Sequence, residues 1–225
     1  MSVGGDSVIG EYILLSMELI GTVAFAVSGA LVAISCSLDL FGVVIVGCTT
    51  AVGGGMIRDL LMGKTPPAIF FKPEILLLAV LTTLAVFIFA ALNSKRFLNI
   101  RQKLEHINIF FDALGLGAFS VAGVEAASEA GLGNNVLLAV TLGVLTGVGG
   151  GILRDVFVNE KPYVLTKHIY AVASIVGCIM YYFIGIYLGH QIVATVVSVV
   201  FILVFRLLAA HFRWKLPKIK LEETK

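Results

Sequence analysis

Long apolar stretches alternate with short polar breaks along the whole chain. Runs of about 20 apolar residues are long enough to cross a ~30 Å hydrocarbon layer as helices. Seven such runs can be drawn, at 11–34, 41–63, 74–92, 107–128, 135–158, 168–188 and 191–212. None of them alternates strictly between apolar and polar residues, as the strands of a membrane barrel do. The pattern predicts an all-α membrane protein with seven transmembrane helices.

The composition agrees with a membrane-embedded chain. Hydrophobic residues make up 59% of it and charged residues 13%, with a mean hydropathy of +1.02; soluble domains carry about 25% charged residues. The first ten residues contain no Lys or Arg, so the first run is read as a retained helix and not as a signal peptide. A net charge of +2 offers no basic surface for nucleic acid. Membrane lipid is therefore an expected partner, and nucleic acid is not.

The second half of the chain repeats the first. Residues 11–92 and 107–188 read as one three-helix unit used twice, joined by a linker at 93–106. The seventh helix, 191–212, and a basic tail at 213–225 stand outside the repeat. The offset is 94 positions in the first helix of each unit and 96 from the glycine triplets onward. The matching residues at the first offset are Glu18, Gly21, Phe25, Val27 and Gly29 with Asp112, Gly115, Phe119, Val121 and Gly123.

A unit with an odd number of helices must enter the membrane from opposite sides in its two copies, so the repeats are predicted to be inverted. Lys and Arg residues concentrate in the linker, in the segment between the fifth and sixth runs, and from Arg206 onward. The positive-inside rule then places the amino terminus outside and the carboxyl terminus in the cytoplasm.

Each unit carries the motif Gly-Gly-Gly-x-x-Arg-Asp within an apolar run. The triplets are Gly53, Gly54 and Gly55, and Gly149, Gly150 and Gly151. Glycine costs a helix interior about 1 kcal/mol relative to alanine, so both helices are expected to be interrupted there. Inverted repeats with interrupted helices near the bilayer midplane commonly form a permeation site. The alternative is that the glycines let neighbouring helices approach closely.

The charged residues within the apolar runs are few. They include Arg58, Asp59, Arg154 and Asp155 of the two motifs, together with the repeat-related acids Glu18 and Asp112. Because an unpaired charge in a membrane is costly, Arg58 and Arg154 are each expected to be held by an acid from a neighbouring helix. Glu125 and Glu129 are expected to form a solvated acidic mouth, with plain surface charge as an equal alternative.

Motifs for enzymatic chemistry are missing from the sequence. It has no phosphate-binding loop, no nucleophile and base at a recognised spacing, and no HExxH metal helix. Three widely spaced cysteines, Cys36, Cys48 and Cys178, indicate neither a disulfide framework nor a metal site. No cofactor is implied, and the chain is not expected to be an enzyme.

The twin glycine motifs and the paired E-x-x-G-x-x-x-F and D-x-x-G-x-x-x-F segments, at Glu18 to Phe25 and Asp112 to Phe119, carry a resemblance. Over residues 11–210 the chain resembles the prokaryotic branch of the trimeric intracellular cation channels. The resemblance implies seven helices in a 3 + 3 + 1 arrangement, a homotrimer, and a separate K+-permeable pore in each protomer. It also implies kinks at both glycine triplets, and places the Arg and Asp of each motif on or beside the pore.

The resemblance also guides the expected location. Animal members have longer charged tails and act in the endoplasmic or sarcoplasmic reticulum, whereas this chain ends soon after its seventh helix. We therefore expect a prokaryotic plasma membrane. The same prokaryotic branch has been linked to glycine uptake, so a small-solute carrier is the alternative function, and a structural scaffold without transport is a third. Permeation of Na+ beside K+ stays open, because no T-V-G-Y-G filter is present.

Overall fold

The structure is a computed structural model that describes residues 3–93, 101–166 and 169–214, with side chains from Gly10 and, after the linker, from Leu104. The described part is helical and contains no strand. Its elements are α1 (Val3–Ser35), α2 (Leu40–Leu61), η1 (Ala68–Phe71), α3 (Pro73–Leu92), α5 (Arg101–Glu129), α6 (Val136–Phe157), α7 (Tyr163–Thr166), α8 (Tyr170–Tyr181), η2 (Tyr182–Tyr187) and α9 (Gln191–His211).

Seven helical segments of the described chain are long and apolar enough to cross a membrane, which confirms the predicted number. The sixth is composite, because α8 continues into η2, a π-helical turn of six residues. The short elements η1 and α7 follow α2 and α6, so each unit has one short helical turn at the same point of its connection.

The two units build their second helices in the same way. Asp39 and Asn135 cap the amino termini of α2 and α6 by accepting hydrogen bonds from the backbone N–H of Gly42 and Leu138. The two helices then begin and end at positions 96 residues apart, at 40–61 and 136–157. The repeat predicted from sequence is therefore a repeat of local structure.

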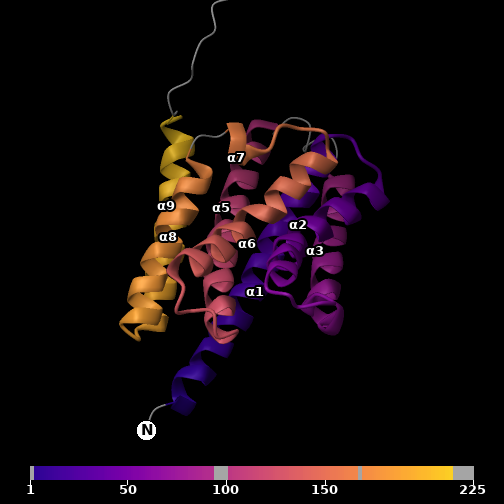
Figure 1. Ribbon diagram of the computed structural model, residues 1–225. Helices are drawn as coiled ribbons and strands as arrows, with labels where there is room; N and C mark the ends of the chain where they lie inside the picture. The colour runs from indigo at the N-terminus through magenta and orange to yellow at the C-terminus, as the bar shows by residue number, and fades with distance from the viewer. Residues whose placement is uncertain (1–2, 94–100, 167–168, 215–225) are drawn as a thin grey trace, which may run out of the picture.

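The equivalent helices of the two units pack together at the centre of the molecule. α1 lies against α5, and α2 lies against α6 (Figure 1). α3 packs against α1 and α2, whereas α8 and α9 form the opposite flank against α5 and α6. The amino terminus lies at one end of the bundle and the end of α9 at the other. The fold is thus two inverted three-helix repeats plus a seventh helix.

Glycine sets how closely the helices of each unit approach. A Cβ on Gly29 of α1 would lie 2.7 Å from the Cα of Gly47 in α2, and a Cβ on Gly123 of α5 would lie 2.7 Å from the Cα of Gly143 in α6. Such separations exclude any larger side chain. Small residues commonly allow this close backbone contact in membrane bundles, so the same device positions the motif helix in both repeats.

Candidate functional site

The Arg-Asp pair of the first motif lies in the last turn of α2 and is closed on itself. The Nε and Nη2 atoms of Arg58 donate to Asp59 Oδ1 at 2.9 and 2.8 Å. Asp59 Oδ2 accepts a hydrogen bond from the backbone N–H of Ala68 at the start of η1. The expectation that an acid from a neighbouring helix holds Arg58 is therefore wrong, because its ion-pair partner is the next residue of its own helix.

Glu18, one of the candidate acids within the apolar runs, is paired with Lys72. Lys72 Nζ lies 2.6 Å from Glu18 Oε2, and the two side chains are 36% and 12% exposed. Lys72 immediately precedes α3, on the connection that carries η1. Its flexible four-carbon stem lets the ammonium reach the α1 carboxylate, which leaves the Arg58–Asp59 pair to itself.

A small open cavity lies between these groups. We call it the Glu18 pocket; it holds about 40 Å³ and is bordered by Glu18, Thr22, Gly55, Arg58, Lys72 and Phe119, among others. A volume of roughly 10–15 Å³ is enough for one water molecule. The first motif therefore borders a space that water and a small ion can occupy.

The second motif is enclosed and has more partners. Arg154 is fully buried; its Nε donates to Asp155 Oδ1 and its Nη1 to Asp112 Oδ1, each at 2.8 Å. Nη1 also donates to Ser28 Oγ at 2.6 Å. The predicted pairing of Arg154 with an acid from a neighbouring helix is thus confirmed, since Asp112 comes from α5. Ser28 adds a third helix, α1, to the same guanidinium.

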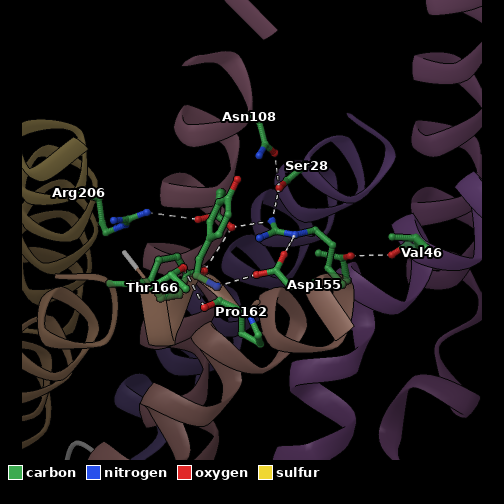
Figure 2. A network of polar contacts seen from close by, with 12 residues as sticks. Ser28, Val46, Asn108, Asp155, Pro162, Thr166 and Arg206 are labelled. Carbon is green, nitrogen blue, oxygen red and sulfur yellow. Dashed lines mark hydrogen bonds and ion pairs between the residues drawn. The ribbon is translucent and has the colours of Figure 1, made fainter. Parts of the chain in front are cut away.

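Further side chains surround this cluster, as Figure 2 shows. Asn108 accepts a hydrogen bond from Ser28, and Tyr170 donates to Asp112 Oδ1 at 3.3 Å. Arg206 of α9 approaches from the side away from Ser28, with its Nη2 3.7 Å from Asp112 Oδ2 and its guanidinium 4.5 Å from the Tyr170 ring centroid. Because Arg206 is buried, it does not count among the cytoplasmic loop charges, which corrects the charge tally behind the predicted orientation.

The connection after α6 covers the cluster from one end of the molecule. Asp155 Oδ2 accepts from the backbone N–H of Tyr163, and the Arg154 guanidinium lies 5.1 Å from the Tyr163 ring centroid. Burial raises the pKa of the Tyr163 phenol, so this side chain stays neutral at physiological pH. Tyr163 therefore covers Arg154 on this side, while Asp155 and Tyr163 both border a larger cavity beyond it.

Neither glycine triplet interrupts its helix. α2 runs unbroken through Gly53 to Gly55, and α6 through Gly149 to Gly151, so the expected interruption is wrong. The middle glycines instead bring the two helices together. A Cβ on Gly54 would overlap the carbonyl oxygen of Thr146, and a Cβ on Gly150 would overlap that of Thr50. The energy that glycine costs each helix is offset by this close crossing.

A second cavity lies beyond the enclosed cluster, at the other end of α1. We call it the Glu160 pocket; it holds about 410 Å³ and is bordered by Val32, Ser35, Glu105, Asn108, Asp155 and Glu160, among others. Its described lining includes three acids and no Lys or Arg. Asn108 and Asp155 belong both to this wall and to the Arg154 cluster, so the cluster seals the inner end of the cavity.

Of the two residues predicted to form a solvated acidic mouth, Glu125 and Glu129, only one is exposed among the described residues. Glu129 is exposed near the end of α5, as expected. Glu125 is 2% exposed and accepts a hydrogen bond from Tyr181 at 2.6 Å. It lies one turn further into the bundle, where α8 covers it, so it is not part of a solvated surface.

Several residues of the two sites escaped the sequence analysis. A buried hydroxyl, phenol or amide carries little signal in a sequence, and Lys72 and Arg206 look like ordinary residues of helix ends. One available signal was the difference between the repeats at equivalent positions. The missed residues are Ser28, Lys72, Asn108, Tyr163, Tyr170 and Arg206.

Comparison with known proteins gives both family and structural matches. A family model described as "Glycine transporter" matches residues 15–91 and again residues 109–185. Solved structures of TRIC cation channels superpose well. One, described as the structural basis for conductance through these channels, has a TM-score of 0.78 and 40% identity over 92% of this chain and 98% of its own. The orthologue from Rhodobacter sphaeroides has a TM-score of 0.80 and 30% identity, over 90% and 99%.

The chain belongs to the trimeric intracellular cation channel family. Curated relatives include the UPF0126 inner membrane protein YadS of Escherichia coli K12, 36% identical over 92% of this chain and 96% of the relative. Another is YvgT of Bacillus subtilis, 37% identical over 89% and 94%. Seven apolar helices and such relatives make this TRIC-family chain a multi-pass protein of a prokaryotic plasma membrane.

Proposed function

We propose that this chain is a K+-permeable cation channel with a pore in each protomer, beside the glycine-rich crossing of α2 and α6. The observation that carries the proposal is the likeness to TRIC cation channels over at least 90% of the chain, at 30–40% identity. The functional class, a cation channel, is that of these neighbours.

The distribution of charge supports cation permeation. The Glu160 pocket offers three carboxylates and no Lys or Arg among its described lining residues. A cleft lined by one sign of charge concentrates the opposite ion. At the other end, the Glu18 pocket combines two acids with two cationic side chains at its wall, so the two entrances differ. The sequence contains no T-V-G-Y-G segment, which in K+ channels supplies rings of backbone carbonyls as a selectivity filter. Weak discrimination between K+ and Na+ is therefore expected.

We further propose that the native assembly is a homotrimer. The solved structures that resemble this chain include a trimeric intracellular cation channel orthologue that aligns over 90% of it. Crosslinking in native membranes should give trimers as the largest abundant species. A dominant dimer would contradict this assembly.

The orientation proposed from the positive-inside rule, with the amino terminus outside, can be read from one native thiol. Cys36 is exposed at the end of α1, whereas Cys48 is half-buried and Cys178 is buried. A membrane-impermeant maleimide should label Cys36 in inverted vesicles and leave it unlabelled in intact cells. Labelling in intact cells would reverse the topology.

A small-solute carrier is the second candidate function, and the matching family description favours it. Lys72 and Glu18 line one compact cavity together, and a zwitterion such as glycine carries charges complementary to both. A carrier would bind, enclose and release this solute, whereas a channel conducts continuously.

Recording from purified protein in planar bilayers, with glycine uptake measured in liposomes, separates these functions. The channel proposal predicts discrete K+ currents that persist without glycine. Saturable glycine flux without such currents would favour the carrier. Absence of both activities would leave a structural role in the membrane.

A further inference from the structure

One face of α1 connects the two cavities. Glu18 and Thr22 border the Glu18 pocket, and Leu31, Val32 and Ser35 border the Glu160 pocket. These residues recur every three or four positions, as residues on one face of a helix do. Between the two groups, the same face carries Phe25 and then Ser28. Thr22 and Leu31 are thus separated by roughly 13 Å along the helix.

Phe25 meets its repeat-related partner Phe119 in this interval. The ring centroids are 5.2 Å apart, and the two side chains are 0% and 6% exposed. Phe119 borders the Glu18 pocket, whereas Phe25 lies behind it against Gly115 and Gly150. The pair therefore forms the apolar floor of the open cavity.

Glycine on the opposite repeat makes room for each ring. A Cβ on Gly21 of α1 would lie 2.9 Å from Phe119 Cε2, and a Cβ on Gly115 of α5 would overlap Phe25. The two helices thus exchange aromatic rings across glycine gaps in a symmetric way. Such an arrangement places both rings at the junction of the repeats, where a movement of one repeat against the other would separate them.

Behind the rings, contacts continue step by step to the second cavity. Gly150, which Phe25 contacts, is followed by Gly151, beside Tyr170, Arg154 and Asp112. Ser28, one turn beyond Phe25, binds Arg154 and Asn108, and Asn108 borders the Glu160 pocket. The rings are therefore the apolar part of the barrier between the cavities, and the Arg154 cluster is its polar part.

We propose that Phe25 and Phe119 form a hydrophobic gate across the permeation path, closed in this structure. An ion cannot shed its water to pass two packed aromatic rings, and apolar constrictions in channels close by losing water. Opening requires the rings to part, as a movement of one repeat against the other would make them do. This inference rests on the proposed channel function for its physiological meaning, but the barrier itself can be measured separately.

Phe119→Ala and Phe25→Ala test the gate in liposomes loaded with K+. Each truncation removes one of the two rings that form the apolar part of the barrier, so passive K+ efflux should rise several-fold above that of the parent protein. Phe119→Leu, which keeps an apolar plug, should stay near the parent rate. Phe183→Ala is the matched control, because Phe183 lies in η2 on the outer flank of the bundle, is 48% exposed and meets Tyr187 of the same segment, with ring centroids 6.3 Å apart.

Melting temperature, measured on the same samples, keeps the result interpretable. If Phe25→Ala does not fold, Phe119→Ala decides, because its side chain already borders a cavity. Folded alanine variants whose K+ efflux equals that of the parent would overturn the gate. A parent without K+ current would instead overturn the proposed channel function, and efflux gained only in the alanine variants would still support the barrier.

Discussion

The two copies of one motif have different surroundings, although their sequences agree at all three glycines and at the Arg-Asp pair. In the first repeat, Arg58 binds its neighbour Asp59 and borders an open pocket. In the second, Arg154 is fully buried and joins α6 to α1 and α5. Identical motifs thus place the arginine beside a pocket in one copy and within an interhelical lock in the other.

Residues outside the motif create this difference. Ser28, which binds Arg154, has Ala122 as its equivalent in the other repeat, and Asn108 has Leu14. Tyr170 has Glu74 as its equivalent. Arg206 belongs to α9, which no second copy provides. The second site therefore gains hydroxyl, amide and aromatic partners that the first site lacks.

Removing the arginine of each motif should give the largest difference in stability between the two sites. Arg154→Ala leaves Asp155 without its cation and Asp112 with only the longer contact to Arg206, and should cost about 3–5 kcal/mol of unfolding free energy, as expected for breaking a buried ion pair. Arg58→Ala should cost only about 1–2 kcal/mol, because Asp59 keeps its backbone bond and borders a pocket that admits water. Melting temperature and folded yield measure both.

A second change tests the cause of this loss. Asp112→Asn added to Arg154→Ala should recover part of the lost stability, because it removes one uncompensated acid. Equal losses of unfolding free energy in Arg154→Ala and Arg58→Ala would contradict the proposed difference between the two sites.

Alanine within the glycine triplets should expose the packing role of the helix crossing. Gly54→Ala and Gly150→Ala each place a methyl group on a backbone carbonyl of the facing helix, and should each cost about 1–3 kcal/mol by overpacking. Gly55→Ala is the control, because its Cβ would meet only Arg58 Nη2, at 3.8 Å. It should be neutral or stabilising by up to about 1 kcal/mol through helix propensity.

Current and melting temperature must be recorded together on these variants. If the glycines act through packing, Gly54→Ala should lower the melting temperature. If they act as a hinge, Gly54→Ala should keep or raise the melting temperature while the K+ current falls. That pattern would restore the interrupted-helix interpretation.

Ser28→Ala makes the second repeat resemble the first at one position. It removes a hydrogen bond to the Arg154 guanidinium and another to Asn108. The expected loss is about 1.5–3 kcal/mol, the range for hydrogen bonds to charged groups. Ser16→Ala on the same helix is the control, since the Ser16 hydroxyl donates to the backbone carbonyl of Ile13, three residues earlier on its own helix. Equal melting temperatures for Ser28→Ala and the parent would remove Ser28 from the lock.

Of the contacts tested, the Lys72–Glu18 pair should contribute least to stability, and its main effect should be on the K+ current. Lys72→Gln should change unfolding free energy by at most about 1 kcal/mol, because partly exposed ion pairs are weak. It should raise K+ conductance at low salt, since a positive charge leaves a pocket on the path. The rise should shrink near 1 M salt, where the Debye length is about 3 Å.

Lys64→Gln, at an exposed lysine in the turn after α2, is the matched control for that charge change. Its effect on current should be smaller. An equal rise in both variants would attribute the change to general surface charge and not to the Glu18 pocket.

Sequence reasoning reached the helices, the repeat and the pairing of Arg154 with an acid from a neighbouring helix. These follow from long apolar runs, an odd number of helices per unit and the cost of buried charge. It could not reach the difference between the repeats, because the motif letters are the same in both. That difference depends on which side chains from other helices reach each arginine, and tertiary packing decides this.

The continuous helices at the glycine triplets have a similar explanation. Helix propensity alone favours an interruption there, because glycine destabilises a helix interior. The compensating contact, between Gly54 and the Thr146 carbonyl and between Gly150 and the Thr50 carbonyl, exists only once both helices are placed. Likewise, Glu125 lies near a helix end in the sequence, but α8 covers it in the fold.

The difference between the two motif sites can be measured directly with Gly55→Cys and Gly151→Cys, at repeat-equivalent positions in a background with Cys36→Ser, Cys48→Ala and Cys178→Ala. Ag+ is close to K+ in size and reacts with thiols, and mass spectrometry after treatment of membrane vesicles reports its access. The Gly55→Cys thiol borders the Glu18 pocket and should react, whereas a Cβ at 151 lies 3.1 Å from the Tyr170 hydroxyl, inside the lock. The account predicts rapid modification at position 55 and protection at position 151; equal rates at both positions would contradict it.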